Sequence, residues 1–214
     1  DVLKDLIKKT VFACSTDESR PLFTGALVEV AAGDINMVAT NTHRLALKKT
    51  TLPETAVAAK MIIPGKLLTE IFKILNFDVP MDVRIFWLKN QVAFLFDNIY
   101  IMSRVIEGQF PDYKKVIPAE FSSFCVLDAN ILHEAVERVS LLARDGEYNI
   151  IKIKFTPTSL ELAGNIPDAG SATESLEVSP EGEPIEIAFN AKYLLDVLKI
   201  AGGGKVKFHL KSPL

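Results

Sequence analysis

The residues that could carry out chemistry are few and dispersed in this sequence. Three glycines precede a lysine in Gly202–Lys205, but a phosphate-binding loop needs Gly-Lys-Ser/Thr at the start of a helix. Here Val206 and a strand-like run follow the lysine, so the glycines predict the end of a helix and a turn. No nucleophile elbow occurs either, and the carboxylates are scattered through turns and the outer sides of predicted helices.

The three histidines and two cysteines form no metal-binding or nucleophilic pattern. His43, His133 and His209 are far apart, and none forms a helical pair or lies beside a cysteine. Cys14 falls on an apolar helical stripe and Cys125 lies in an apolar strand-like run, so both are predicted to be buried free thiols. The sequence thus indicates no catalytic residue, metal or cofactor. An enzyme that acts on a small molecule, with catalytic groups that converge at the junction of the two halves of the chain, stays open as an alternative.

One polar run is a candidate binding site. His43 and Arg44 lie in a turn between strand-like runs, within Val38–Leu47. Two interpretations are open from these residues: the side chains cap a hairpin, or they face a partner. A second notable segment, Glu107–Pro118, carries Gly108 and two prolines, which predicts an extended connector between two halves of the chain.

Apolar periodicity predicts the elements that must hold these residues. One stripe of apolar residues runs from Leu3 to Cys14 with three lysines turned away from it, and Asp128 is a candidate N-cap for a later helix. The predicted helices cover 3–14, 67–75, 132–142 and 193–201. The predicted strands cover 22–30, 37–40, 44–48, 61–63, 83–87, 92–96, 99–105, 121–127, 150–155, 160–163, 172–178, 185–189 and 206–210.

The two halves repeat one plan. Pro64–Leu75 aligns with Asn190–Ala201 at an offset of 126 residues, with lysine on lysine twice and an acid on an acid. Each half has two helices and mainly antiparallel strands, which predicts an α+β fold with the sheets covered by helices on one face. We expect two domains, 1–119 including the connector and 120–214, the second lacking a closing hairpin.

Composition is that of an ordinary globular protein. Apolar residues make up 49% of the 214 residues, and the net charge of -3 argues against a wholly basic nucleic-acid wrapper. No signal peptide and no bilayer-length apolar run is evident, so a cytoplasmic protein is expected.

Together with Phe110–Pro118 and Ala188–Leu198, the run Val38–Leu47 closely resembles the bacterial DNA polymerase III beta subunit family, the sliding clamps. The resemblance covers the whole chain but only the family's second and third domains, so the chain is expected to be a fragment. It implies a non-catalytic processivity factor without cofactor, which forms a head-to-tail dimeric ring around duplex DNA. The fragment itself is expected to be mainly monomeric.

The resemblance also implies site residues. DNA is expected to be contacted through its backbone, without base preference, by lysines on the helices: Lys4, Lys8, Lys9, Lys66, Lys73, Lys192 and Lys199. Leu141 and Leu142 align with residues of the dimer seam. Counted over the helix bodies, the positive charges exceed the negative ones only slightly, so the charge signal is weak without the resemblance.

The family's partner-peptide pocket receives the polymerase subunit, the clamp loader and other proteins with a clamp-binding motif. Its pattern falls here on Arg20, Phe23, Thr40, Thr42, His43, Arg44, Leu45, Pro111, Lys115 and Val116. The motif is a glutamine followed by leucine and a terminal Leu-Phe pair. Phe23 and Thr42 are bulkier than the leucine and glycine common in the family, and Lys115 replaces a more usual arginine. Pro21 and Leu22 stand where some members have DNA-contacting tyrosines, so that contact is not expected.

Overall fold

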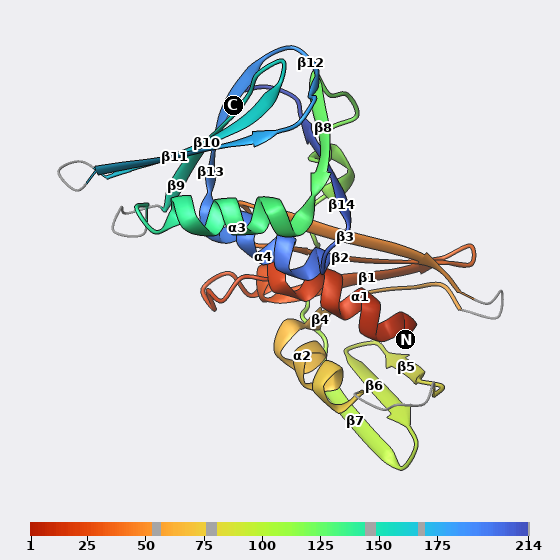
Figure 1. The fold of residues 1–214 in the computed structure, drawn as a ribbon. Coiled ribbons are helices and arrows are strands. Elements are labelled where there is room, and N and C mark those ends of the chain that lie inside the picture. Colours follow the sequence, from red (N-terminus) through yellow and green to blue (C-terminus); the bar gives the residue numbers. More distant parts are fainter. Residues whose placement is uncertain (53–56, 76–80, 144–148, 167–169, 214) are drawn as a thin grey trace. The chain divides into compact units, whose positions relative to one another are not determined.

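The computed structural model describes residues 1–52, 57–75, 81–143, 149–166 and 170–213. It divides into two compact units, Asp1–Tyr113 and Lys114–Leu214, and the division falls inside the predicted connector (Figure 1). Every strand pairing within the described residues is antiparallel, which confirms the predicted α+β class. None of the described helices is long and apolar enough to cross a membrane.

The first unit contains two α-helices and two sheets. Helix α1 (Val2–Thr10) continues as a 3-10 turn, Val11–Ala13, and α2 spans Gly65–Ile74. The strands are β1 (Gly25–Ala31), β2 (Asp34–Thr40), β3 (Leu45–Thr51), β4 (Ala59–Pro64), β5 (Arg84–Leu88), β6 (Gln91–Phe96) and β7 (Ile99–Arg104). They form one sheet in the order β3-β2-β1-β4 and another in the order β5-β6-β7.

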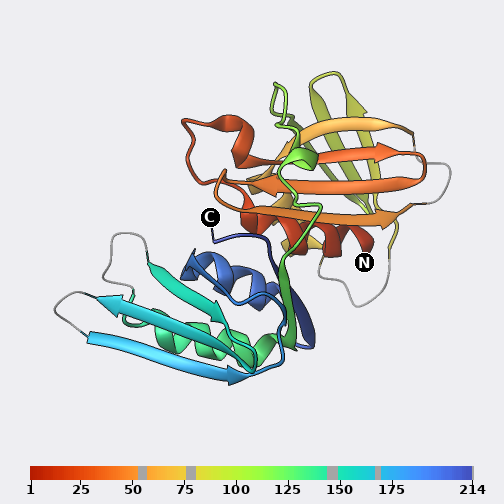
Figure 2. The same cartoon turned by 90° about the horizontal axis from the view of Figure 1, so that it is seen from above.

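The four-stranded sheet of this unit has apolar residues on both faces. Alternate residues of β1, such as Val28 and Val30, join Leu6 and Leu68 of the helices in the main core. Residues between them, such as Leu27, point to the other face and belong to a separate apolar cluster. Helix α1, the red helix in Figure 2, therefore covers only one face of the sheet.

The second unit repeats this plan with its own core. Helix α3 spans Ala129–Ser140 and α4 spans Ala191–Ala201. The strands are β8 (Ser123–Asp128), β9 (Ile150–Phe155), β10 (Ser159–Ile166), β11 (Gly170–Glu177), β12 (Glu181–Gly182), β13 (Ile185–Asn190) and β14 (Lys205–Leu210). Their sheets have the orders β11-β10-β9-β13 and β12-β8-β14.

The internal repeat is visible in the elements of both units. Helix α2 begins at Gly65 and α4 at Ala191, which is again an offset of 126, and β4 and β13 keep the same offset. The order β3-β2-β1-β4 matches β11-β10-β9-β13 strand for strand. The similarity between the halves seen in the sequence therefore reflects one structural unit used twice.

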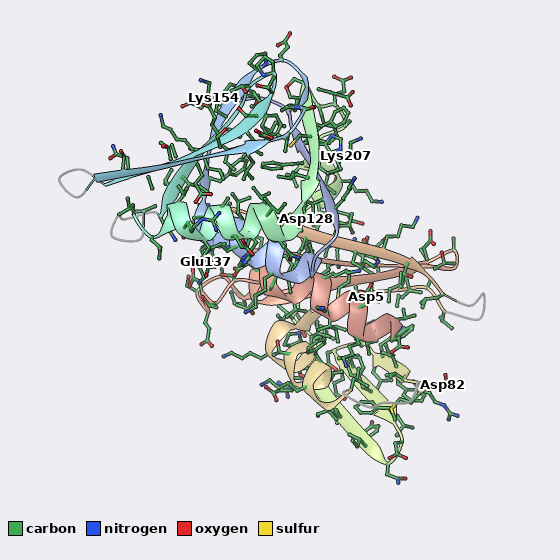
Figure 3. All side chains as sticks on the ribbon, in the orientation of Figure 1. Asp5, Asp82, Asp128, Glu137, Lys154 and Lys207 are labelled. Atoms are coloured by element: carbon green, nitrogen blue, oxygen red, sulfur yellow. The ribbon has the colours of Figure 1, made fainter. Side chains whose placement is uncertain are left out.

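Local signals account for the helix ends. Asp128, labelled in Figure 3, accepts hydrogen bonds from the backbone N–H of Asn130 at 2.8 Å and of Ile131 at 3.2 Å, as an N-cap should. Gly202 ends α4 in the left-handed conformation with φ of 70°, so the glycine cluster is a helix stop.

Two predictions of local structure are wrong. The sequence predicts a strand that starts at Leu22, but residues Pro21–Thr24 form a 3-10 turn. The physical reason is Pro21, which favours the first turn of a helix. The short strand β12 is absent from the predicted elements, because two residues, Glu181 and Gly182, carry no periodic signal.

An ion pair ties α3 to the edge strand β11. Arg138 donates through Nε to Glu174 Oε1 at 2.5 Å and through Nη2 to Oε2 at 2.9 Å. Hydrogen bonding from this guanidinium holds the pKa of Glu174 below its ordinary value of 4.5. The carboxylate side chain is 24% exposed, so solvent screens the pair only in part.

We predict that Glu174→Gln lowers the free energy of unfolding by about 0.5–1 kcal/mol at pH 7. Because the folded-state pKa is depressed, this contribution is present above the ordinary pKa and disappears as the pH falls through the folded-state pKa. Urea unfolding across a pH series measures it. The control is Glu177→Gln on the same strand, whose carboxylate has no ion pair with any described residue. If the difference in free energy of unfolding between wild type and Glu174→Gln persisted at pH 2, the ion pair with Arg138 would not be its cause.

Candidate peptide-binding site

The turn between β2 and β3 is fixed by its own polar side chains. Thr40 Oγ1 donates to the carbonyl of Arg44 at 2.7 Å, and Asn41 Oδ1 accepts from the backbone N–H of His43 at 3.1 Å and of Arg44 at 3.0 Å. Thr42 has φ of 79°, a conformation that favours glycine, so the structure holds a strained residue here. Thr42 and His43 are exposed at the tip.

Arg44 anchors this turn to the end of the first helical segment. Its Nη2 donates to the carbonyl oxygen of Phe12 at 2.6 Å, and the guanidinium carbon lies 5.3 Å from the centroid of the Phe12 ring. The side chain is partly buried. Both interactions are structural, so Arg44 contributes at least in part by placing the turn.

The loop before β1 lies beside the turn. Arg20 Nη1 donates to Thr42 Oγ1 at 3.4 Å, and Arg20 Nε donates to Asp17 Oδ2 at 3.1 Å. Hydrogen bonds from Ser19 and then from Arg20 lower the pKa of Asp17. Phe23 is half-buried in the 3-10 turn. The residues predicted at the polar rim, Arg20 and Thr42, are therefore in direct contact.

Behind this rim lies the apolar cluster on the outer face of the β1–β4 sheet. One row of cross-strand neighbours, Ile62, Leu27 and Val38, is buried there. The connector covers this row with Phe110 and Tyr113, which are 5% and 6% exposed. Three partly buried residues pack against the cluster: Leu22, Leu45 and Ile106.

Leu22 packs against this apolar cluster and is not among the predicted pocket residues. A Cβ added to Gly108 would lie 2.6 Å from Leu22 Cδ2, which shows how closely the connector approaches this side chain. The sequence signal that could have identified Leu22 is its apolar side chain next to Phe23. It was missed because the residues from Leu22 onward have the pattern of a strand. Pro111, in the same connector, is exposed.

The remaining predicted pocket residues belong to the second unit. Lys115 lies in the 3-10 turn Tyr113–Lys115, and Val116 is 68% exposed. The first unit thus brings together the loop, the turn and the connector as far as Tyr113. The participation of Lys115 and Val116 stays a prediction.

The helix lysines differ in whether they form ion pairs with acidic residues of the chain. Lys9 pairs with Asp5 at 2.8 Å, Lys66 with Glu18 at 2.7 Å and Lys73 with Glu70 at 2.7 Å. Asp5, labelled on α1 in Figure 3, also pairs with Lys48 from β3 at 3.1 Å.

Three other lysines have side chains exposed to solvent. Lys8, Lys192 and Lys199 are exposed and form no ion pair with any described residue. Lys4 lies with its Nζ 5.7 Å from the centroid of the Phe72 ring. At the end of α3, Leu141 is 54% exposed, whereas Leu142 is partly buried.

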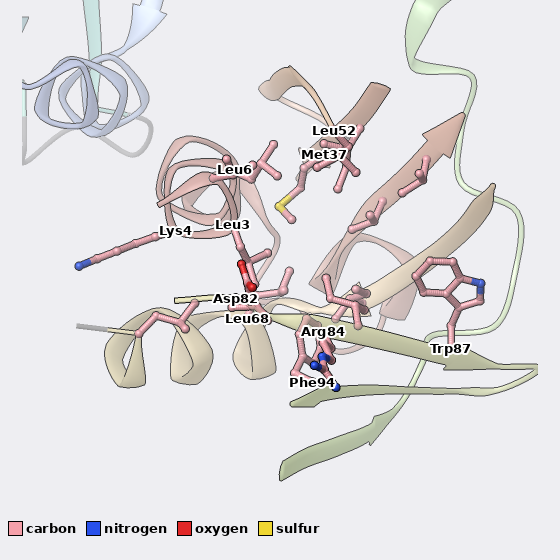
Figure 4. Close-up of a pocket in the computed structure, with 18 of the residues that line it drawn as sticks. Leu3, Lys4, Leu6, Met37, Leu52, Leu68, Asp82, Arg84, Trp87 and Phe94 are labelled. Atoms are coloured by element: carbon pink, nitrogen blue, oxygen red, sulfur yellow. The ribbon is translucent and has the colours of Figure 1, made fainter. Parts of the chain in front are cut away.

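A cavity of about 660 Å³ lies elsewhere in the first unit. It is bordered by α1, α2, the inner face of the β1–β4 sheet and β5, and apolar side chains such as Leu6, Met37 and Phe94 line it (Figure 4). Lys4 extends away from it, while Asp82 and Arg84 lie along one side (Figure 4). No group of potential metal ligands occurs in the part of the chain that the structure describes.

Comparison with known proteins identifies the family. Residues 1–112 match the family described as DNA polymerase III beta subunit, central domain, and residues 114–214 match the one described as its C-terminal domain. The beta sliding clamp of Bacillus subtilis (strain 168) is 38% identical over 211 residues, which cover 97% of this chain and 55% of the relative. The beta sliding clamp of Staphylococcus aureus (strain Mu50 / ATCC 700699) is 36% identical over 207 residues, covering 96% and 55%.

Solved structures agree with this assignment. The crystal structure of the DNA polymerase sliding clamp from Bacillus subtilis has a TM-score of 0.93 at 37% identity, over 99% of this chain and 56% of that chain. The chain thus spans about half the length of the relatives it matches. The enzyme alternative finds no support among these matches. The chain belongs to the DNA polymerase III beta subunit family, the bacterial sliding clamps, and corresponds to its central and C-terminal domains.

Proposed function

We infer that this chain is the part of a ring-shaped, non-catalytic processivity clamp that presents the partner-binding site and part of the DNA-facing surface. Family membership supports the role, and the repeated unit of two helices on antiparallel sheets suits a ring made from similar segments. In the intact protein the ring closes head to tail around duplex DNA, with Leu141 and Leu142 at the seam between subunits. The ring tethers the replicative polymerase through the partner-binding site. The clamp loader and other proteins with a clamp-binding motif bind at this same site.

The observation that carries the peptide site is the apolar cluster shared by three segments far apart in the sequence. Leu22 from the loop, Leu45 from the turn and Phe110 from the connector pack on one sheet face. A polar rim with Arg20 and Thr42 lies beside it. An apolar floor with a few fixed polar groups suits a short peptide anchored by leucine and phenylalanine.

DNA would be held loosely by the helices. A ring that slides needs phosphate contacts without base contacts, and lysines provide these contacts. Because Lys9, Lys66 and Lys73 already have acidic partners, Lys8, Lys192 and Lys199 are the stronger candidates among the predicted lysines. Few phosphates are then neutralised at once, and the closed ring provides the retention on DNA.

We predict that Leu45→Ala weakens binding of a peptide with glutamine, leucine and a terminal Leu-Phe pair about tenfold, because it removes a partly buried apolar side chain from the floor. Fluorescence anisotropy with a labelled peptide measures the dissociation constant. The matched control is Leu88→Ala in β5, where the leucine is 71% exposed and belongs to the other sheet of the first unit. Equal losses for both variants, or none for Leu45→Ala, would contradict the site.

We predict that replacing Lys8, Lys192 and Lys199 together by alanine weakens binding to duplex DNA equally for all sequences. For each phosphate that a lysine no longer neutralises, the slope of log affinity against log salt should become shallower by about 0.9. The comparison variant replaces Lys9, Lys66 and Lys73, whose charges are paired, and should change the slope less. A salt titration of binding to two unrelated duplexes measures both effects. Submicromolar binding to only one of the duplexes would refute the sliding interpretation.

A further inference from the structure

The connector is held on the outer face of the β1–β4 sheet at two places. Near its start, the backbone N–H of Ile106 donates to the carbonyl of Ile62 at 2.8 Å, and a Cβ on Gly25 would lie 2.7 Å from Ile106 Cδ1. Further along, Phe110 and Tyr113 are buried against the same face. Figure 2 shows the connector, in green, crossing the strands of this sheet.

The second attachment has a polar component. Tyr113 donates its hydroxyl proton to Glu29 Oε2 at 2.8 Å, across a separation of 84 residues in the sequence. The other carboxylate oxygen, Oε1, lies 2.9 Å from Lys60 Nζ, and Lys60 is the cross-strand partner of Glu29. A tyrosine of the connector, a carboxylate of β1 and an ammonium group of β4 are thus linked in series.

This polar link requires the Glu29 carboxylate to be withdrawn from water, which costs free energy. The Glu29 side chain is only 19% exposed, and withdrawing a carboxylate from water is unfavourable unless its partners are well placed. Burial, and then the bond to Glu29, raises the pKa of Tyr113 to about 12, as expected for a phenol that is withdrawn from water and donates to a carboxylate. An apolar side chain at Tyr113 would cover the sheet equally well.

The hydrogen bond between Tyr113 and Glu29 fixes the position of the connector relative to β1. Apolar contacts are non-directional, so Phe110 and the Tyr113 ring alone would let the connector shift along the sheet. A charge-assisted hydrogen bond fixes one atom of the connector against one atom of β1. The same sheet face carries Leu45, and Pro111 lies between the two buried aromatic residues.

We propose that Glu29, supported by Lys60, positions Tyr113 and thereby sets the connector wall of the peptide site. This inference rests on the proposed function of that site. Tyr113 and Glu29 do not touch the peptide; they act through the placement of the segment Ile106–Tyr113. A peptide selects this placement because its leucine and phenylalanine side chains must fit between the connector and the turn that carries Leu45.

The test is a double-mutant cycle with Tyr113→Phe and Glu29→Ala, read by affinity for the clamp-binding peptide. Each single variant should weaken binding threefold to tenfold, and the double variant should be no weaker than the worse single variant. Glu29→Gln, which keeps an acceptor oxygen for the Tyr113 hydroxyl but loses the charge that pairs with Lys60, should restore part of the affinity lost in Glu29→Ala. The matched control is Tyr100→Phe, because Tyr100 is 60% exposed and its hydroxyl lies 3.9 Å from Met102 Sδ, outside the site.

Amide hydrogen exchange over 106–115 provides the second readout, and it needs no peptide. Exchange there should be faster in Tyr113→Phe than in wild type, while exchange in α1 and α2 stays unchanged. Multiplicative losses in the cycle, or wild-type affinity in Tyr113→Phe, would overturn the proposal while leaving the peptide site intact. Absence of peptide binding by wild type would overturn the proposed function and this inference with it, whereas unchanged exchange would overturn the positioning role alone.

Discussion

The sheet β3-β2-β1-β4 of the first unit has to be covered on both faces, and the arrangement of the candidate site depends on this. Helices α1 and α2 bury one face with Leu6 and Leu68. The other face presents Leu27, Val38 and Ile62, and leaving them in water would cost about 25 cal/mol for each Å² of apolar surface. The connector satisfies this need, because Phe110 and Tyr113 cover that row.

Covering a sheet with an extended segment also leaves apolar side chains partly exposed along its edge. A helix would have closed the face with a broad apolar stripe, whereas the connector covers one row and leaves Leu22 and Leu45 only partly buried beside it. Within the turn of Thr40–Leu45, Thr40 and Asn41 form hydrogen bonds, and Arg44 bonds the turn to Phe12. We infer that the same packing that completes the fold prepares the rim of a peptide site.

Much of this could be predicted from the sequence. The offset of 126 predicted a repeated unit, because equivalent helices must bury equivalent stripes, and α2 and α4 keep that offset in the structure. Asp128 and Gly202 were recognisable as helix ends from their residue types. Leu22 has the appearance of a strand residue because apolar residues continue without interruption into β1, and only the proline before it signals a 3-10 turn.

Other parts of the site depend on contacts that no local pattern records. Glu29 has the appearance of an ordinary outward carboxylate in a strand, and its bond to Tyr113 arises only when the connector folds back over the sheet. Arg44 was open to two interpretations, and its bond to Phe12 supports the structural one. Likewise, the pairing of Lys66 with Glu18 joins a helix to a loop, which no local sequence pattern records.

The most direct test of this peptide site is nuclear magnetic resonance of the isotope-labelled chain titrated with the unlabelled peptide that carries glutamine, leucine and a terminal Leu-Phe pair. We expect the largest amide shift changes in Thr40–Leu45 and Ile106–Tyr113, with smaller changes around Leu22. Changes confined to the residues that line the cavity of Figure 4, such as Leu6, Met37 and Phe94, would show that the peptide binds elsewhere and that the proposed site is wrong.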